Sequence, residues 1–411
     1  MSPKKKHTVA KKAPKKETKV KIRVNPAKEF AEAMKAQGIA TVSHLSNDEA
    51  VSNIPGRVGT GSLALDMLLT NPSEPTGWAG FPLGRVTEVY GPPHIGKSTL
   101  LDHGFAEVQK MDGQAVLADT EISRDRHYTN RLGVDLEKLS YLEFARDGLF
   151  LQNVVKVICK TIDFWGKNYP ETPVLIGWDA LGGTATKEDV DKALKQEVKQ
   201  DEKEKAVQPG SAAKAMHQAS RLFPGLLAGR KIGVVILNHE YEMIGGFGGG
   251  FGAKRKETYG GSGTRHLCTN RIQLFSKGEY IKKSDGSVVG RVVTAKIVKN
   301  RLGASLTEVG IPILHGSGVS NIYTVFEDLK EAKIIVTSGG WSAINLDGVI
   351  LKFQGWNGLN EKCNEDPTLF DRLVSVWKAV KHASLRLQVP EVQQDGGSDN
   401  PIRETEEPAE A

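Results

Sequence analysis

Eight residues beginning at Gly91 constrain this chain more than any other part of its sequence. Gly91–Ser98 reads Gly-Pro-Pro-His-Ile-Gly-Lys-Ser and matches every fixed position of the pattern G-x-x-x-x-G-K-[ST]. The stretch Arg85–Tyr90 before it is typical of a strand, and Ser98–Lys110 after it is typical of a helix. Glycines let backbone N–H groups converge on phosphate oxygens, and the helix N-terminus adds partial positive charge. The sequence therefore predicts a nucleotide phosphate site between a strand and a helix.

The chemistry of this loop assigns roles to individual residues. Lys97 is expected to reach the β and γ phosphates, and the Ser98 hydroxyl is expected to ligate Mg²⁺. The apolar strand Val174–Trp178 is followed by Asp179, whose carboxylate is expected to hold the magnesium shell. ATP and Mg²⁺ are therefore the predicted cofactors. The loop residues predicted to contact the nucleotide are Gly91, Pro92, Pro93, His94, Ile95, Gly96, Lys97, Ser98 and Thr99.

Hydrolysis also needs a base that orients water toward the γ-phosphorus. In an open parallel sheet, residues just past the strand ends line the ligand crevice. Three carboxylates, Asp119, Glu121 and Asp125, follow the predicted strand Ala115–Ala118. Glu121 is the best placed by this rule, but position alone leaves Asp119 and Asp125 as competitors.

From about residue 83, short apolar stretches alternate with helical ones. This alternation predicts an α/β fold whose mostly parallel central sheet is covered by helices on both faces. The Asp-Gly pair within Lys283–Ser287 is typical of a hairpin turn, so an antiparallel region is expected after the parallel one. The predicted strands are Val86–Tyr90, Ala115–Ala118, Val174–Trp178, Ile232–Leu237, Arg271–Phe275 and Val292–Val298, and the clearest helices are Ser98–Lys110 and Ala212–Leu222.

Shifts in composition divide the chain into five expected regions. These are a basic tail over 1–27, a small N-terminal helical and linker region over 28–82, the nucleotide-binding core over 83–314, a small α/β C-terminal domain over 315–380 and an acidic tail over 381–411. Near-helical spacing of Phe30, Ala33, Met34 and Ile39 predicts a helix within 28–50. Two core segments read as long functional loops: the charged stretch 186–211 and the Gly-rich stretch 240–263.

The formal net charge is +6, and charges of opposite sign are concentrated at the two ends of the chain. The first 23 residues are almost purely cationic, whereas the last 20 are acidic. Both ends lack the apolar residues needed for a core, so both tails are expected to be disordered. The basic arm is compatible with phosphate contact, with a nuclear-localisation signal or with a solvated tail. No apolar run suits a membrane span or a secretory signal, and three scattered cysteines fit a reducing compartment. A cytoplasmic protein is expected.

Several further segments, taken together and in order, carry a specific resemblance. Residues 59–66 are similar to a T-G-S-L-x-L-D lead-in, and residues 84–92 to a G-R-I-x-E-I-Y-G-P strand. Asp119-Thr120-Glu121 corresponds to D-A-E, Val298–Arg301 to V-K-N-K, and Gly316–Val319 to G-E-G-I; Asp125, Tyr128 and residues 132–135 match D-x-x-Y…L-G-V-D. The chain thus resembles the bacterial RecA recombinases and their phage relatives over about residues 57–378, most weakly over 185–212.

The resemblance implies a nucleotide site that is shared between subunits. Members of this family stack into helical filaments with ATP at the interface. Glu121 would be the catalytic base, Tyr128 would stack on adenine with Asp125 beside it, and Lys299 and Arg301 would reach the γ-phosphate of the neighbouring subunit. Arg301 replaces the family's second Lys, which keeps the charge. A solvated strand edge is the alternative for the Lys299–Arg301 pair.

The resemblance also implies contact with single-stranded DNA, with homologous duplex DNA and with mediator or single-strand-binding proteins. The two long loops fall where the family binds DNA. His239 stands where the family has a Gln that senses the γ-phosphate; a His would sense phosphate with a pH dependence or simply pack in the core. Contacts within 186–211 are not assigned individually. The expected DNA-binding residues of the second loop are Ile244, Phe247, Phe251, Lys254, Arg255, Lys256, Gly260, Gly261 and Arg265.

The favoured interpretation is a DNA-dependent ATPase that forms a filament on single-stranded DNA for homologous pairing and strand exchange in bacterial or phage-infected cytoplasm. The alternatives are a related ring helicase or branch-migration ATPase, a regulatory DNA-binding protein without turnover, and a small-molecule kinase. The C-terminal Gly-Ser-Gly-Val module argues against the motor, the intact Lys97 and Glu121 against loss of turnover, and the Gly-rich basic loop against the kinase.

Overall fold

The chain divides into two units, Met1–Asn53 and Ile54–Ala411. The structure, a computed structural model, describes residues 30, 33, 34, 36, 53–69, 80–144, 148–196, 210–243, 255–283, 286–303 and 305–386. In the first unit, Phe30, Ala33, Met34 and Ala36 are helical, and the rest of the helix predicted within 28–50 lies outside the described residues. The basic tail over 1–27 also lies outside them. Of the acidic tail predicted over 381–411, the first six residues belong to the helix Pro367–Arg386, so the prediction is wrong there, and the rest lies outside the described residues.

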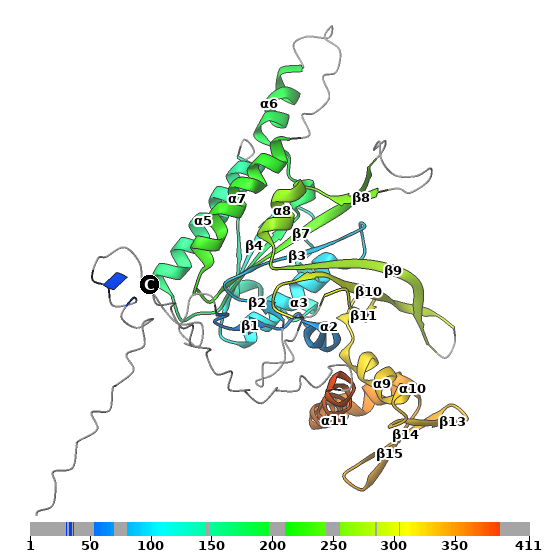
Figure 1. Cartoon of the computed structure of the whole chain (residues 1–411). Helices are drawn as coiled ribbons and strands as arrows, with labels where there is room; N and C mark the ends of the chain where they lie inside the picture. Colours follow the sequence, from blue (N-terminus) through cyan, green and yellow to red (C-terminus); the bar gives the residue numbers. More distant parts are fainter. Residues whose placement is uncertain are drawn as a thin grey trace, which may run out of the picture. The chain divides into compact units, whose positions relative to one another are not determined.

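A large sheet forms the core of the second unit (Figure 1). Its strands are β3 (Val86–Gly91), β4 (Gln114–Asp119), β5 (Leu139–Tyr141), β6 (Val174–Asp179), β7 (Ile232–Met243), β8 (Arg255–Thr258), β9 (Asn270–Lys282), β10 (Val288–Asn300), β11 (Glu308–Leu314) and β12 (Gly318–Val319). The order is β12-β11-β10-β9-β3-β7-β6-β4-β5, with β8 paired to β7. Every pair from β9 to β5 is parallel, whereas β9 to β12 pair antiparallel.

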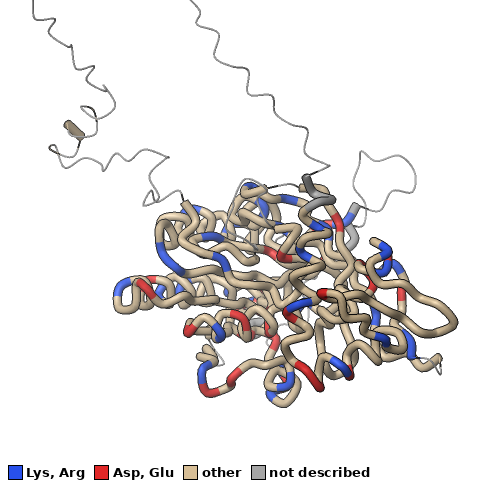
Figure 2. The backbone as a smooth tube through the Cα atoms, turned by 90° about the horizontal axis from the view of Figure 1, so that it is seen from below, with Lys and Arg blue, Asp and Glu red and all other residues tan. Residues whose placement is uncertain are grey.

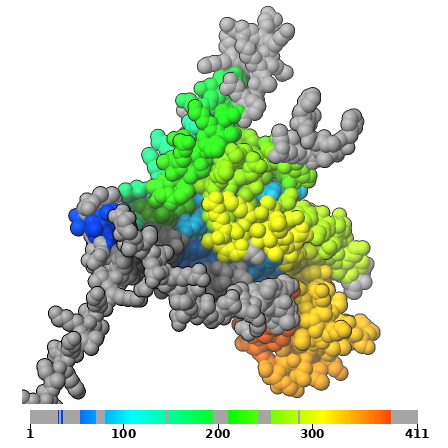
Figure 3. Space-filling model, in the orientation of Figure 1, coloured from blue at the N-terminus to red at the C-terminus, as the bar shows by residue number. Residues whose placement is uncertain are grey.

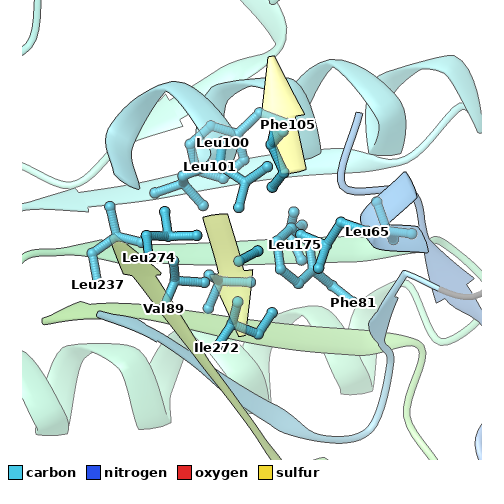
Figure 4. Packing of buried hydrophobic residues seen from close by; sticks show 14 of the residues in the cluster. Leu65, Phe81, Val89, Leu100, Leu101, Phe105, Leu175, Leu237, Ile272 and Leu274 are labelled. Atoms are coloured by element: carbon cyan, nitrogen blue, oxygen red, sulfur yellow. The ribbon is translucent and has the colours of Figure 1, made fainter. Parts of the chain in front are cut away.

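Helices cover both faces of this sheet, which confirms the predicted α/β fold with a mostly parallel centre. Helix α3 (Lys97–Lys110) packs on one face, where Leu101 and Phe105 meet side chains from the central strands (Figure 4). Helices α5 (Leu151–Asn168) and α7 (Ser211–Leu227) pack on the other face. All six residues of β6 are buried, as expected for a parallel strand covered on both sides.

Two small elements precede the phosphate-binding loop. Helix α2 (Leu63–Leu68) begins at Ser62, whose side chain accepts a hydrogen bond from the Leu65 N–H at 3.4 Å. Strands β1 (Arg57–Val58) and β2 (Phe81–Pro82) pair antiparallel. Ser62 therefore has the role of an N-cap.

The charged segment 186–211 is more regular than predicted. Its first part forms helix α6 (Lys187–Gln196), so the loop prediction is wrong there. Thr186 and Asp189 bond reciprocally, because the Thr186 N–H donates to the Asp189 carboxylate at 3.1 Å and the Asp189 N–H donates to the Thr186 hydroxyl at 3.3 Å. This capping box, followed by residues of good helix propensity, favours a helix over a loop. Residues 197–209 lie outside the described part.

The Gly-rich segment 240–263 is also shorter as a loop than predicted. Strand β7 continues to Met243 and pairs antiparallel with β8, and helix α8 (Gly261–Leu267) follows. Only 244–254 lies outside the described residues. The hairpin expected near Lys283–Ser287 is present between β9 and β10, and both strands extend beyond their predicted ends because they pair with each other along most of their length.

A buried polar cluster joins the middle strands. Glu88 on β3 is fully buried and accepts hydrogen bonds from the Arg271 guanidinium on β9 at 2.5 Å and from the Asn238 amide on β7 at 2.8 Å. The Arg271 guanidinium also lies 4.9 Å from the centre of the Tyr90 ring and donates to the Thr258 hydroxyl at 3.1 Å. The cluster thus ties the strand that carries the phosphate-binding loop to the β7–β8 hairpin.

Breaking this buried ion pair is expected to destabilise the core. Arg271→Met leaves the Glu88 carboxylate buried without its cation, so we expect a loss of about 3–5 kcal/mol in the free energy of unfolding. Adding Glu88→Gln should recover part of the loss, because the buried charge is then gone. Urea unfolding followed by fluorescence checks both variants. A double variant less stable than the single one would contradict this account.

Residues 321–386 form a small α/β module with its own buried hydrophobic cluster. These residues are coloured from yellow-orange to red in Figure 3. The module contains α9 (Asn321–Glu331), the antiparallel strands β13 (Val336–Ser338), β14 (Trp341–Leu346) and β15 (Val349–Phe353), then α10 (Gly355–Glu365) and α11 (Pro367–Arg386). The Asn321 side chain accepts from the Leu63 N–H at 3.0 Å and donates to the Gly61 carbonyl at 2.9 Å. Among the described helices, none has both the length and the apolar character of a membrane span.

Candidate functional site

The phosphate-binding loop connects the end of β3 to the start of α3. Gly96 at the helix N-cap has a φ of 104° and His94 has a φ of 59°, so the loop curls through left-handed conformations. A Cβ at Gly91 would lie 2.2 Å from the Leu274 carbonyl oxygen, and one at Gly96 would lie 2.6 Å from the Ile313 side chain. Glycine is therefore required at position 91 by the β9 backbone, and at position 96 chiefly by the left-handed φ.

The rest of the loop divides into anchored and exposed residues. Ile95 is buried in the hydrophobic cluster between the sheet and α3, whereas Pro93 and His94 are exposed. The Lys97 ammonium donates to the Gly91 carbonyl at 3.1 Å and to the Pro92 carbonyl at 2.9 Å. Burial lowers the pKa of Lys97, and the nearby carboxylates of Asp179 and Glu121 oppose that shift. Lys97 is thus a largely buried cation held at the loop.

A hydroxyl and a carboxylate face each other beside Lys97. Ser98 at the start of α3 donates to the Asp179 carboxylate at the end of β6, over 2.7 Å. Burial raises the pKa of Asp179, while Arg124 and the Ser98 hydrogen bond oppose the rise. Hard oxygen donors from a hydroxyl and a carboxylate are what Mg²⁺ takes in nucleotide sites, so these residues fit the predicted metal. A magnesium ion held there would neutralise phosphate charge.

The three candidate bases differ in what their carboxylates do. Asp119 accepts the N–H of Ile122 at 2.9 Å and the Tyr141 hydroxyl at 3.2 Å, so it stabilises the turn after β4. Asp125 caps helix α4 (Arg126–Arg131) by accepting the His127 N–H at 2.8 Å. Glu121 instead points its carboxylate at His239, 2.6 Å away. The geometry therefore favours Glu121, because the other two carboxylates have local structural roles.

Tyr128 lies on α4 next to the first turn of α3. Its hydroxyl is 3.2 Å from the Thr99 hydroxyl, and its side chain is half-buried. Two predicted nucleotide-contacting residues, from separate elements, are thus brought together with the loop. Asp125, at the N-cap of the same helix, is exposed beside them.

Lys299 and Arg301 lie at the sheet edge opposite the chain's own phosphate-binding loop. Asn300 pairs with Asn270 on β9, and Asn270 pairs with Thr87 near the start of β3. The loop, by contrast, begins where β3 ends. The Lys299 ammonium donates to the Arg265 carbonyl at 2.6 Å, and burial together with Arg301 lowers the pKa of Lys299. Neither cation therefore lies beside the phosphate-binding loop of its own chain.

Comparison with known proteins identifies the family of the chain. The family model described as the RecA N-terminal domain matches residues 27–155 and 189–320, which is more than half of the chain. The chain belongs to the RecA family. This family is the RecA type of recombinase.

Curated RecA proteins match most of the chain at modest identity. Protein RecA of Oleidesulfovibrio alaskensis is 30% identical over 357 residues, covering 85% of this chain and 88% of that protein. Protein RecA of Mycoplasma mobile is 29% identical over 319 residues, covering 77% and 85%. Protein RecA of Roseiflexus castenholzii is 28% identical over 343 residues, covering 83% and 85%. The gap in the family match is 156–188, so the match includes most of the segment 185–212 in which the resemblance was expected to be weakest.

The DNA-binding residues expected from the RecA resemblance are only partly described. Ile244, Phe247, Phe251 and Lys254 lie outside the described residues. Arg255 begins β8, and Lys256 forms an ion pair with Glu240 at 3.0 Å while remaining 55% exposed. Gly260 and Gly261 have φ values of 85° and 63° at the start of α8, and Arg265 is exposed on that helix. Basic and acidic residues are interspersed along the backbone in Figure 2, so their distribution in that view does not identify a DNA-binding face.

His239 makes the most direct contact with the candidate base of this RecA-family site. It lies on β7 immediately after Asn238, which belongs to the buried cluster around Glu88. Glycines leave room for the pair: a Cβ at Gly182 would lie 2.7 Å from the His239 ring, and one at Gly183 would lie 2.9 Å from the Glu121 side chain. A side chain at the end of the β7 core thus contacts the residue expected to orient water.

One residue of the site escaped prediction from sequence. Arg124 follows β4, is only 11% exposed, and reaches both the α3 helix and Asp179. No motif includes it, because it falls between the Asp-Thr-Glu and Asp-x-x-Tyr segments. The sequence shows only a cation two residues before a helix and shortly after a strand end that carries carboxylates. That pattern is too general to assign a role.

Proposed function

We propose that this RecA-family chain is an ATP-dependent recombinase that forms a filament on single-stranded DNA, pairs it with homologous duplex DNA and exchanges strands. Lys97 would bind the phosphates, Ser98 and Asp179 would hold Mg²⁺, and Glu121 would orient the attacking water. Hydrolysis of ATP would be stimulated by single-stranded DNA. The cell compartment that fits such a substrate is the cytoplasm of a bacterium or of a phage-infected host.

One observation carries the proposal: the separation of Lys299 and Arg301 from the chain's own phosphate-binding loop. In a head-to-tail stack, the sheet edge that bears these cations would meet the loop of the next subunit. The site would then be complete only between subunits, and hydrolysis would report assembly. A heterologous contact of this kind generates an open helix when the rotation does not close.

Homologous pairing distinguishes a recombinase from a related motor. We expect the full chain, with ATP and Mg²⁺, to form joint molecules between single-stranded DNA and a supercoiled duplex of the same sequence. A heterologous duplex serves as the control. Unwinding of a forked duplex without joint molecules would favour the helicase or branch-migration alternative and would count against the proposal.

The contact between His239 and Glu121 predicts a graded response to substitution. A Gln amide can still donate to the Glu121 carboxylate, so His239→Gln should keep hydrolysis stimulated by single-stranded DNA within about threefold of the wild type. His239→Ala removes a hydrogen bond to a charged group and should lower the rate about tenfold or more. Steady-state hydrolysis measures both, with the exposed His315→Ala as control. Equal rates for the wild type and His239→Ala would remove His239 from the site.

A further inference from the structure

Arg124 lies between two buried carboxylates at the metal side of the nucleotide site. Its Nη1 donates to the Asp102 carboxylate on α3 at 2.8 Å and approaches the Ser98 carbonyl at 3.3 Å. Its Nη2 lies 3.1 Å from Oδ2 of Asp179. The side chains of Asp102 and Asp179 are 1% and 6% exposed, so water screens these contacts weakly.

The Asp179 oxygen that lies near the Arg124 guanidinium also contacts Ser98, the other expected metal ligand. Oδ2 of Asp179 also accepts the Ser98 hydroxyl at 2.7 Å. Arg124 Nε and Nη2 are buried and have no hydrogen-bond partner among the described residues. The cation is therefore held beside Asp179 mainly by charge, while its position is fixed through Asp102, which also accepts the Thr129 hydroxyl at 3.0 Å.

This placement has an electrostatic consequence for a divalent cation. A guanidinium stays charged at all physiological pH values and repels a second cation strongly at short range in a poorly solvated site. Arg124 contacts both Asp102 and Asp179, so its positive charge offsets the charge of two buried carboxylates at this point. Among the described residues, no group of three or more acidic, His or Cys side chains is arranged to hold a metal.

We propose that Arg124 is the resident counter-ion of Asp179, which keeps the metal site closed to a free divalent cation until a nucleotide supplies negative phosphate charge. The metal then enters only together with the nucleotide. Arg124 is in this sense a positioning residue that acts through Asp179. The inference rests on the proposed function, because it takes Asp179 as the metal carboxylate.

The test measures Mn²⁺ binding to the full-length protein by electron paramagnetic resonance, without and with a non-hydrolysable ATP analogue. Without nucleotide, Arg124→Gln should bind Mn²⁺ at least about tenfold more tightly than the wild type, since a repelling charge has been removed. Arg124→Lys keeps the charge and should match the wild type. Arg126→Gln removes the same charge from an exposed neighbour and is the matched control. Asp102→Asn with Arg124→Gln also removes the carboxylate that would lose its cation, and serves if the single variant does not fold.

The two arms separate failure of this inference from failure of the proposed function. If the analogue strengthens Mn²⁺ binding to the wild type, but removing Arg124 without nucleotide has no effect beyond that of Arg126→Gln, the counter-ion role is overturned. Wild-type protein that binds Mn²⁺ equally tightly with and without the analogue would overturn it as well. If the analogue-loaded wild type binds no Mn²⁺ at all, the metal assignment of Ser98 and Asp179 fails first.

Discussion

Lys97→Ala is expected to lower ATP hydrolysis at least about a hundredfold, because a preorganised cation at a transferring phosphoryl group stabilises the transition state and not only the bound substrate. The Lys97 ammonium is already held at the loop by the Gly91 and Pro92 carbonyls, so it needs little reorganisation to meet phosphate oxygens. Steady-state phosphate release with saturating single-stranded DNA measures the effect.

The matched control for this variant is Lys110→Ala at the other end of the same helix. Lys110 is 68% exposed and forms a surface ion pair with Glu107 three residues before it, so its loss should leave turnover and melting temperature nearly unchanged. Unchanged hydrolysis in Lys97→Ala, in protein that is folded by circular dichroism, would overturn the assignment of the whole nucleotide site.

Removing both Lys299 and Arg301 is expected to have an effect of similar size for a different reason. Cations that reach a γ-phosphate from a neighbouring subunit contribute on the order of a thousandfold or more to the rate. The double alanine variant should therefore lose turnover while still binding nucleotide. Lys277→Ala with Lys296→Ala is the matched control, because both residues lie on β9 and β10 but pair with Glu308.

Mixing the defective proteins tests whether the site is shared. A subunit with Lys299→Ala and Arg301→Ala retains a complete phosphate-binding loop, and a Lys97→Ala subunit retains the two cations. Mixed filaments should therefore regain part of the wild-type hydrolysis rate, through junctions where one subunit supplies the loop and the next supplies the cations. No recovery at any mixing ratio would contradict a site formed between subunits.

Local patterns in the sequence predicted the elements that depend on few residues. The phosphate-binding loop could be recognised because its glycines, Lys97 and Ser98 act within one strand–loop–helix unit. Strands β3, β4 and β6 were predicted to within one residue at each end, because buried parallel strands are short continuous apolar runs. The short, mostly exposed edge strand β5 was not predicted. Helix α6 was not predicted, because its sequence is charged and has few aliphatic residues; its start is marked only by the Thr186–Asp189 capping box.

Features that depend on distant residues could not be predicted in the same way. Position left Asp119, Glu121 and Asp125 as competing bases, and only the three-dimensional contacts separate them. The His239–Glu121 contact joins residues 118 positions apart, and the Arg124–Asp179 ion pair likewise joins separate strands' ends. Such pairs depend on the order of the strands in the sheet. The alternation of strands and helices predicts a mostly parallel sheet but not its strand order. The distance between Lys299 and the phosphate-binding loop likewise could not be predicted, because it depends on the register between β9 and β10.

The most direct test of the central claim is ATP hydrolysis by the full chain with and without single-stranded DNA, with the same samples imaged by negative-stain electron microscopy. The account predicts strong stimulation by single-stranded DNA together with helical filaments. Hydrolysis that is indifferent to DNA, in samples that contain closed rings or single subunits, would contradict it.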